Sequence, residues 1–442
     1  MFYIIESEDQ LERVRSSCNT PTYVDVIPTN DNYHPKLSNT VAIYLKPLNK
    51  KEGYLIPISH YDGLNVEKER IYAILNEIDI LYTLDKKKLL YHFNLQGAID
   101  ISLAYSMVYY KRLEYSTQSQ TIDWYYNRHS EKEDINRIIP IGKLYQRCEA
   151  VYNKIEPVIK KLEIPDGFNF YNNTATNVFF LIEQQGVGVN YEEFNTAFDI
   201  KKPIYNSIEN TVLTYYNLYN STSRPTNSYN SVNFAAIPHT EKHRNTFKPQ
   251  NDHFVELDFD GYHLRLLCEQ IGYELTDESA HKQLAKHYFG TEDITDEQYI
   301  QAKQINFQAI YGKIPEEHRD LQIFKLIQSY IDEMWRMYKE EGFVCNPQSG
   351  KPFTSNLKEM HPAKLMNYMM QSLETSNNIG ILKDVLRYLK DKKTFITLYT
   401  YDSITIDFSK DDGKEVLENI QKIMEKDGRY PTKWKAGKNL YL

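Results

Sequence analysis

Residues 254–272 change their pattern of hydrophobic and polar positions halfway along. Val255 and Leu257 alternate with polar neighbours, which predicts a strand. After Asp260 the hydrophobic residues recur at helical spacing, which predicts a helix that begins where the strand ends. Asp258 would then lie at a sheet edge that a ligand can reach. Taken alone, Asp258 or Asp260 is explained equally well as a cap of the helix N-terminus.

The remaining patterns predict a mixed α+β chain. Strands are predicted over residues 1–5, 22–28, 40–47, 53–59 and 87–93. Helices are predicted over 7–18, 67–78, 141–162, 173–185, 205–219, 295–311, 362–390 and 414–426, with further helical sequence between 311 and 338. Two irregular segments are predicted at 115–137 and at the polar, turn-rich 220–233. Two strand-like runs, 394–401 and 404–408, flank Asp402 and Ser403 and predict a hairpin.

Composition and charge exclude several classes of protein. The 442 residues suffice for two or three domains, and the net charge of −8 means that any nucleic acid would need a local basic groove. The 37 tyrosines are explained by base stacking or by an AT-rich coding sequence, and we favour the second for most of them. The four cysteines form no CxxC pair, which indicates a reducing compartment and no zinc site. Without a signal peptide or a membrane-length apolar run, we expect a soluble, cytoplasmic protein.

Asp258 and Asp402 are each predicted at the end of a strand. Either aspartate alone is more often a turn residue, but two of them side by side in one sheet can share divalent cations. Mg²⁺ takes one or two carboxylates plus substrate phosphates. Two such ions about 3.5–4 Å apart stabilise the attacking and leaving oxygens of a phosphoryl transfer.

The helix predicted over 295–311 has an unusual stripe. Tyr299, Lys303, Phe307 and Tyr311 recur every four residues and share one face. An aromatic stripe usually faces a core. With a lysine in its middle, this one also suits a triphosphate with a base stacked above it.

Several segments in the C-terminal half match, in order, the motifs of one family. They are TSRPTN with Arg224 (for TGRLSS), VNFAAIP with Asn233 (for PNLQNIP), DFDGYHLR at 258–265 (for DYSQIELR), K-x-x-x-F-x-x-x-Y-G from Lys303 to Gly312, NYMMQS with Asn367 and Gln371, and Tyr401-Asp402-Ser403 (for HDE). Trp434 and Gly437 are similar to the C-terminal signature. The chain resembles family A DNA polymerases, which include bacterial DNA polymerase I and many phage replicative polymerases.

The resemblance implies an α+β palm–fingers–thumb polymerase with an N-terminal α/β, ribonuclease H-like exonuclease domain. We expect that domain at 1–165, a reduced thumb at 166–215, and palm and fingers at 216–442, with the fingers at about 273–340. The expected activity is template-directed addition of deoxynucleotides to a primer 3′ end by two-metal phosphoryl transfer. Its partners would be primer–template DNA, deoxynucleoside triphosphates and an accessory processivity or replication protein, with no membrane. The location would be the host cytoplasm for a phage enzyme.

The same resemblance assigns roles to individual residues. Asp258 and Asp402 would hold two Mg²⁺ ions, or Mn²⁺, together with the Phe259 backbone carbonyl. Lys303 would neutralise the triphosphate, and Phe307 and Tyr311 would pack against the sugar and the nascent base pair. The expected DNA contacts are Arg224, Asn233, Asn367 and Gln371.

Three departures from the family pattern weaken the resemblance locally. His263 replaces the glutamate that screens the ribose 2′-hydroxyl, Tyr299 replaces an arginine that contacts phosphate, and Ser403 replaces a carboxylate. They are typical of a divergent, phage-type enzyme. They also admit the alternative of a weakened or inactive polymerase-fold DNA-binding protein.

The exonuclease motifs of the N-terminal domain are damaged. D-x-E reads Asp25-Val26-Ile27, the residue four after Asn94 is Ala98, and only Cys148 and Glu149 stand near the expected third motif. Metal binding should fail with so few ligands, so a proofreading relic is favoured over a nuclease with unrecognised ligands. The segment 178–194 matches the start of the thumb, but the following chain is too short for two long thumb helices.

Overall fold

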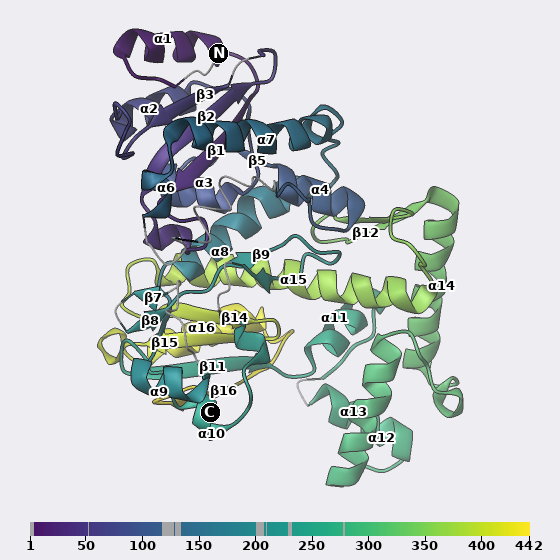
Figure 1. The fold of residues 1–442 in the computed structure, drawn as a ribbon. Coiled ribbons are helices and arrows are strands. Elements are labelled where there is room, and N and C mark those ends of the chain that lie inside the picture. Colours follow the sequence, from purple (N-terminus) through teal and green to yellow (C-terminus); the bar gives the residue numbers. More distant parts are fainter. Residues whose placement is uncertain are drawn as a thin grey trace.

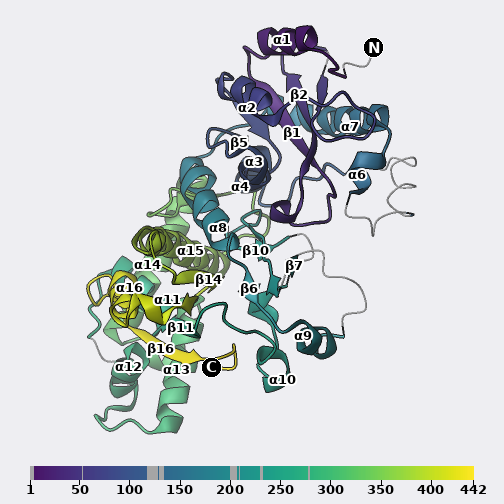
Figure 2. The same cartoon turned by 90° about the vertical axis from the view of Figure 1, so that its left-hand side faces the viewer.

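The computed structural model describes residues 4–51, 53–116, 128, 134–199, 207–208, 210–228, 232–276 and 279–442. Figures 1 and 2 show an N-terminal sheet unit above a larger C-terminal part that holds a second sheet and a group of helices. The long helix α15 (Pro362–Leu389) runs between the C-terminal sheet and the N-terminal unit (Figure 1).

The N-terminal sheet has five strands in the order β3-β2-β1-β4-β5. They are β1 (Thr22–Pro28), β2 (Thr40–Pro47), β3 (Tyr54–Pro57), β4 (Leu81–Thr83) and β5 (Ile99–Asp100). Strands β3, β2 and β1 pair antiparallel, while β4 and β5 continue in parallel. Val24 and Val26 face one buried cluster, and Tyr23 and Ile27 face the other. Both faces of the sheet are therefore covered, as expected when side chains alternate along a strand.

Six described helices surround this sheet. They are α1 (Glu8–Ser17), α2 (Lys68–Asn76), α3 (Lys86–Phe93), α4 (Ile101–Tyr109), α6 (Ile135–Ile138) and α7 (Ile141–Lys160). The prediction of a strand over 87–93 was wrong, because this segment is α3. The Asp85 carboxylate caps it by accepting a hydrogen bond from Lys88 N, and Leu89, Leu90 and Phe93 follow helical spacing into the core.

Two further predictions fall partly on residues outside the described ranges. Of the strand predicted over 1–5, only Ile4 and Ile5 are described, and Ile4 forms a parallel bridge with Leu55. Most of the irregular segment predicted over 115–137 lies outside them as well.

The helix predicted over 205–219 is also wrong where the chain is described. The structure has short strands β6 (Val187–Gly188), β7 (Ser207–Ile208), β8 (Thr211–Val212), β9 (Tyr216–Asn217) and β10 (Thr226–Asn227). The sheet β6-β8-β7 and the pair β10-β9 result. Every residue from Val212 to Tyr216 is buried, whereas a surface helix would bury one face. An extended segment that lies between two units of the fold is covered on all sides, which explains why all five residues are buried.

The C-terminal sheet has four antiparallel strands in the order β14-β15-β11-β16. They are β11 (His253–Phe259), β14 (Phe395–Thr400), β15 (Ser403–Phe408) and β16 (Thr432–Gly437). Val255, Leu257 and Phe259 enter the main core. Alternation therefore turns Glu256 and Asp258 to the opposite face.

Helices cover the core side of this sheet and extend beyond it. They are α8 (Thr176–Glu183) after the π-helical turn η2 (Phe170–Ala175), α11 (Tyr262–Ile271), α15 and α16 (Glu415–Glu425). A further group, α12 (Ala280–Phe289), α13 (Asp296–Ile310) and α14 (Gln322–Glu341), lies to one side, at the lower right of Figure 1. Short α9 (Tyr191–Ala197), α10 (Glu241–Arg244) and the hairpin β12–β13 (Phe343–Cys345, Pro352–Thr354) complete the described elements apart from 3-10 turns. The predicted strand-to-helix stretch, the hairpin and the helix over 295–311 are confirmed.

Helix α13 ends against the start of α15. Gly312 follows it with φ +80°, and a Cβ atom there would lie 2.8 Å from Ala363 Cα. Only glycine permits both this backbone conformation and this close approach. The end of α13 is therefore fixed relative to α15.

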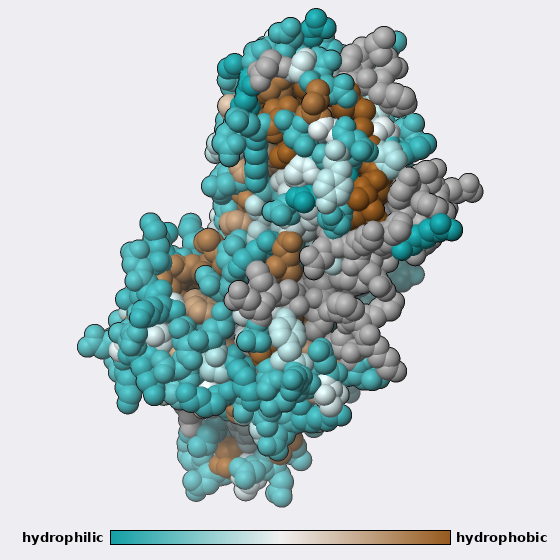
Figure 3. Space-filling view, turned by 60° about the vertical axis from the view of Figure 1, so that its left-hand side comes forward, coloured by the Kyte–Doolittle hydropathy of each residue, from teal (hydrophilic) through white to brown (hydrophobic). Residues whose placement is uncertain are grey.

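The surface and the cysteines agree with the composition. The face in Figure 3 is largely hydrophilic, with its largest hydrophobic patches over the N-terminal unit. All four cysteines are free thiols. None of the described helices combines the length and the hydropathy that crossing a membrane requires.

Candidate active site

A cavity of about 360 Å³ opens where the C-terminal sheet, α11, α13 and α15 meet. Its walls carry ten residues named in the sequence analysis, together with three that were not: Arg224, Asp258, Phe259, Asp260, His263, Tyr299, Lys303, Phe307, Tyr311 and Asp402, and in addition His281, Glu374 and Lys433. They come from segments far apart in the sequence. The cavity therefore exists only in the folded chain.

Asp258 and Asp402 lie side by side on neighbouring strands. Asp258 is opposite Ser403 in the β11–β15 register, and Phe259 N donates to the Asp402 carbonyl oxygen at 3.2 Å. Burial, followed by the charge of Asp402, raises the pKa of Asp258 to about 6. Burial and then the charge of Glu374 raise the pKa of Asp402. The two carboxylates are thus crowded and partly desolvated, a strain that a bound cation would relieve.

Neither Asp258 nor Asp260 caps helix α11, which settles the alternative that the sequence left open. The N-cap is Gly261, in a left-handed conformation with φ +62°, and it makes no side-chain cap hydrogen bond. Asp260 instead bonds to Lys433, whose Nζ lies 3.0 Å from Asp260 Oδ1.

The tip of the β14–β15 hairpin is held by two distant side chains. Tyr401 has φ +63°, a conformation that costs free energy for a residue with a Cβ. Asn378 Nδ2 on α15 donates to the Tyr401 carbonyl oxygen at 2.6 Å. The Arg224 guanidinium stacks over the Tyr401 ring, 3.7 Å from its centroid. These contacts fix the residue that precedes Asp402.

Glu374 is a site residue that sequence reasoning missed. It lies on α15, is 1% exposed, and its Oε2 is 3.0 Å from Arg224 Nε. Its Oε1 is 3.0 Å from His263 Nε2. Its signal in the sequence is that Asn367, Gln371, Glu374 and Asn378 recur at helical spacing, and so share one face of α15.

The stripe of α13 faces the aspartates across the cavity. Tyr299, Lys303, Phe307 and Tyr311 all line it. Lys303 is exposed, with its Nζ 5.9 Å from the Phe307 ring centroid. Phe307 is 41% exposed, far above a core residue. The stripe is therefore a wall of the cavity, and only its last residue, Tyr311, also packs against the main core.

His281 of α12 also lines the cavity, and no local pattern marks it in the sequence. Its Nδ1 accepts a hydrogen bond from Asn306 Nδ2 at 2.9 Å, which leaves the ring proton on Nε2. Burial, and then the charge of Lys303, lower the pKa of His281 to about 4. At neutral pH it is thus an uncharged hydrogen-bond donor beside Lys303.

The remaining predicted residues lie at different distances from the cavity. Gln371 Nε2 donates to Asn367 Oδ1 at 2.8 Å, and Gln371 Oε1 accepts from Thr222 Oγ1 at 3.3 Å, next to the segment with Arg224. Asn233 is exposed and does not line the cavity. The Phe259 ring is buried and stacks on Tyr262 with centroids 4.2 Å apart.

The donor set limits what the cavity can hold. Among the residues the structure describes, no three His, Cys, Asp or Glu side chains gather around one point as a metal site would require. A zinc-like site is thus absent from the described part. Two neighbouring carboxylates suit Mg²⁺, which keeps water and substrate phosphates as its other ligands.

A second cavity, of about 370 Å³, lies in the N-terminal unit beside Asp25. Lys88 Nζ is 3.6 Å from Asp25 Oδ1, and Arg147 Nη1 is 2.8 Å from Asp31 Oδ2. Glu149 is turned elsewhere, to Lys46 at 3.4 Å and to the Tyr44 hydroxyl. Asp25 and Asp31 are thus each paired with a basic side chain, while Asp85, which also lines the cavity, accepts hydrogen bonds from Lys88 N and the Tyr215 hydroxyl.

Comparison with known proteins supports the fold but not the sequence family. No protein-family model and no curated protein sequence matches the chain. Among solved structures, it is similar to the POL domain of Pol1 from M. smegmatis, determined in complex with a DNA primer-template and dNTP. The TM-score is 0.67 at 13% sequence identity, covering 100% of this chain and 99% of that chain. The chain therefore has the mixed α+β fold of a DNA polymerase domain.

Proposed function

We propose that this protein is a template-directed DNA polymerase of the family A type, which adds deoxynucleotides to a primer 3′ end. The observation that carries the proposal is the pairing of Asp258 with Asp402 in one cavity, opposite the Lys303 face of α13. It occurs within a fold shared with a polymerase domain. The C-terminal sheet would be the palm, α12–α14 the fingers, and the short strands after α8 a reduced thumb.

The aspartate pair would hold two Mg²⁺ ions, or Mn²⁺, with the Phe259 carbonyl oxygen as a further ligand. The raised pKa of Asp258 supports this, because nearby positive charge would restore its ionised form. Bound magnesium would neutralise the reacting phosphates and favour attack by the primer hydroxyl. The chain's own contribution is position: the hairpin contacts of Tyr401 fix Asp402 beside β11 before any substrate arrives.

The α13 wall would bind the nucleotide. Lys303 would neutralise the triphosphate, and the neutral His281 would donate a hydrogen bond to it. Phe307 and Tyr311 would pack against the sugar and the base. His263 would lie near the ribose of the nucleotide. Its Nε2 is 3.0 Å from Glu374 Oε1, so Glu374 would orient the His263 ring, and discrimination against ribonucleotides would depend on this pair.

The primer–template would lie along the α15 side of the cavity. Arg224, Asn367 and Gln371 are grouped there and would contact it, while Asn233 would reach it from the neighbouring surface. Because the described thumb region is small, grip on the duplex would depend on an accessory processivity protein. We place the protein in the cytoplasm, of the host if it is phage-encoded.

The N-terminal unit would be an exonuclease-like domain that no longer cuts DNA. Lys88 and Arg147 pair with two of the three carboxylates that line this cavity and that metal ions would need, which supports this assignment. A primer labelled at its 5′ end, incubated with Mg²⁺ and no nucleotides, tests it. Stable primer length is the expected result, and shortening from the 3′ end would overturn it.

Asp402→Asn tests the polymerase proposal. We expect primer extension to fall by about 10³-fold or more, because a metal ligand is lost from the reacting centre. Asp411→Asn, an exposed aspartate beyond the same hairpin, is the matched control. Equal activity of Asp402→Asn and the native chain would overturn the metal role.

An inactive native chain that still binds primer–template would favour the second candidate, a DNA-binding protein with the polymerase fold. Ser403, Tyr299 and His263, which depart from the family pattern, are the features that favour this second candidate.

A further inference from the structure

The charges that line the main cavity are unevenly paired. Its carboxylates are Asp258, Asp260, Glu374 and Asp402, and its permanent cations are Arg224, Lys303 and Lys433. Arg224 is held by the buried Glu374, through an Nη2 hydrogen bond of 3.3 Å and the Nε contact. Only Lys303 and Lys433 are left to meet an anionic ligand.

Lys433 reaches the cavity from the sheet. Strand β16 pairs with β11 so that Lys433 is opposite Asp258, which brings its side chain to the face of the sheet that carries the aspartates. Its Nζ lies 3.0 Å from Asp260 Oδ1, and the Lys433 side chain is 69% exposed. Water and salt screen the exposed ammonium end of this pair, which weakens it, whereas the Asp260 side chain is 13% exposed. Lys433 can therefore turn from Asp260 to a stronger anion, and Asp260 keeps some contact with water when it does.

The opposite wall lacks a second cation. On α13 the residue one turn before Lys303 is Tyr299, a neutral side chain. A triphosphate is polyanionic and would enter a cavity that already holds four carboxylates. The metal ions of the proposed function would balance much of that charge, and with Arg224 held by Glu374, Lys303 is the one lysine of the α13 wall that would meet the rest.

We propose that Lys433 is a second phosphate-binding residue of this cavity. It would leave Asp260 and contact the β- or γ-phosphate of the incoming deoxynucleoside triphosphate, from the wall opposite Lys303. This assignment rests on the proposed function and adds to it a residue from the last strand of the sheet. Asp260 is then the resting partner that holds the ammonium at the cavity while it is empty.

Lys433→Gln tests this, with nucleotide binding as the readout. We expect the KM for a deoxynucleoside triphosphate to rise about tenfold to a hundredfold, the usual loss for one hydrogen bond to a charged group. The kcat should change by less than about threefold, because this interaction is made equally in the ground and transition states. Binding of a deoxynucleoside monophosphate and of primer–template should stay the same. An unchanged triphosphate KM, or an equal loss for the monophosphate, would overturn the proposal.

Lys435→Gln is the matched control. Lys435 is on the same strand and the same face, two residues further on, but it pairs with Glu256 in the register and does not line the cavity. It should leave the KM unchanged. A comparable rise in this variant would show that only the general charge of β16 matters, and the assignment would fail.

A double variant separates phosphate binding from simple neutralisation of Asp260. If Lys433 only neutralised Asp260, then Asp260→Asn would make it dispensable and Lys433→Gln/Asp260→Asn would regain the native KM. If Lys433 binds phosphate, the double variant stays as weak as Lys433→Gln and Lys433→Arg recovers most of the affinity. Comparing the two single variants with the double variant isolates the interaction between Lys433 and Asp260.

Failure of the polymerase proposal would be visible separately. If the native chain extends no primer, calorimetric titration of the intact chain with dATP and Mg²⁺ replaces the KM measurement. Weaker binding by Lys433→Gln than by the native chain would support the assignment without any catalysis. Equal binding by the two, or no binding by the native chain, would overturn it.

Discussion

Two buried charges, Glu374 and Lys351, fasten the segment that carries Arg224. Glu374 pairs with Arg224 itself. Lys351, fully buried after β12, donates to the Asn220 carbonyl oxygen at 3.3 Å and to the Ser223 hydroxyl. Burying an ionisable group costs free energy unless it is paired or hydrogen-bonded, so these contacts are needed to keep both side chains in place.

Glu374→Gln should lower the free energy of unfolding by about 2–3 kcal/mol, because a partly buried guanidinium loses its counter-charge. Urea unfolding of the two chains measures it. Asp384→Asn, an exposed residue on the same helix paired with Arg387, is the control and should change little. A loss no greater in Glu374→Gln than in the control would contradict the pairing.

Lys351 gives the fold a pH dependence of its own. Burial lowers the pKa of Lys351 from 10.5 to about 7. Between these values the unfolded chain binds more protons than the folded chain, so this group makes stability rise with pH across that window. Relative to Lys351→Met, the native chain should gain up to about 1.4 kcal/mol per pH unit from pH 7.5 to 9.5. Urea unfolding at several pH values measures the difference.

Lys358→Met, an exposed lysine just beyond the same hairpin, provides the control for that pH series. Its stability should differ from that of the native chain by a constant amount at every pH. Parallel curves for Lys351→Met and the native chain would mean that Lys351 titrates normally, with solvent reaching it.

At the scale of elements, α13 depends on its first turn. Few of its side chains are buried, namely those of Ala302, Asn306, Ala309 and Ile310. Thr295 Oγ1 accepts from Gln298 N at 3.2 Å, while Gln298 Oε1 accepts from Thr295 N at 3.0 Å, which completes a capping box. A helix with so little core contact relies more than usual on such a cap.

Thr295→Ala should therefore destabilise the start of α13 by about 1 kcal/mol. Amide hydrogen exchange of the first two turns measures it as faster exchange there and unchanged exchange in α15. Ser279→Ala is a matched control: Ser279 is the N-cap of α12, but its hydroxyl has no partner among the described residues. Equal acceleration in both helices would contradict the role of the capping box.

Elements that carry a clean period, an apolar run of strand length, or turn and cap residues were predictable, including strands β1 and β2, which are buried along almost their whole length. The β11–α11 junction, the β14–β15 hairpin and α13 each carry a clean period and turn or cap residues. Segment 212–216 is buried on every side, so its hydrophobic residues mimic helical spacing. For α3, the capping residue Asp85 was a signal of a helix, but the apolar run within 87–93 led to the prediction of a strand.

For the site, sequence reasoning found the residues that carry a motif and missed those that only the fold brings to the cavity. Asp258, Asp402 and the α13 stripe were named and do line one cavity. Glu374, His281 and Lys433 were missed, because each is defined by a contact across the fold. Asn233 was named from its motif and lies outside the cavity. Spatial partners of this kind leave only faint signals in one sequence.

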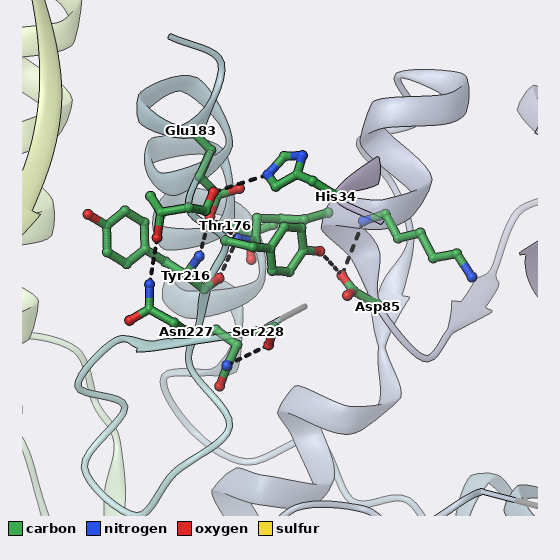
Figure 4. Close-up of polar contacts among 12 residues, drawn as sticks. His34, Asp85, Thr176, Glu183, Tyr216, Asn227 and Ser228 are labelled. Atoms are coloured by element: carbon green, nitrogen blue, oxygen red, sulfur yellow. Dashed lines mark hydrogen bonds and ion pairs between the residues drawn. The ribbon is translucent and has the colours of Figure 1, made fainter. Parts of the chain in front are cut away.

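At the scale of the whole molecule, a buried polar network joins the N-terminal unit to the segment before Arg224 (Figure 4). His34 Nε2 lies 3.0 Å from the Thr214 carbonyl oxygen, and the Tyr215 hydroxyl donates to Asp85 Oδ1 at 2.6 Å. The Tyr219 hydroxyl donates to Asp100 Oδ2 at 3.0 Å. Segment 214–219 is thus tied at several points to the N-terminal unit.

The centre of this network is an ion pair between Lys87 of α3 and Glu183 of α8. Their side chains are 8% and 0% exposed. Glu183 also accepts from Tyr216 N at 2.5 Å and from the Tyr91 hydroxyl at 3.2 Å, and Lys87 donates to the Tyr216 carbonyl oxygen. The pair joins the two units, so the N-terminal unit helps to hold the segment that leads to Arg224.

Lys87→Met should therefore affect the molecule as a whole. It leaves Glu183 buried without a counter-charge, which costs about 3–5 kcal/mol. Calorimetry should show a lower unfolding temperature, with the N-terminal unit melting before the rest. Lys160→Met, which changes an exposed lysine of α7, is the control. It should unfold at the same temperature as the native chain, without separate melting of the N-terminal unit.

Adding Glu183→Leu to Lys87→Met decides whether the loss comes from the unpaired charge. Two apolar side chains of similar size remove the charge and its desolvation together, so the double variant should regain much of the lost stability. Primer extension should recover in parallel, because segment 214–219 would again be packed against both units ahead of Arg224. If the double variant is as unstable as Lys87→Met, the hydrogen bonds to Tyr216 and Tyr91 matter more than the charge, and the network joins the two units through its neutral contacts.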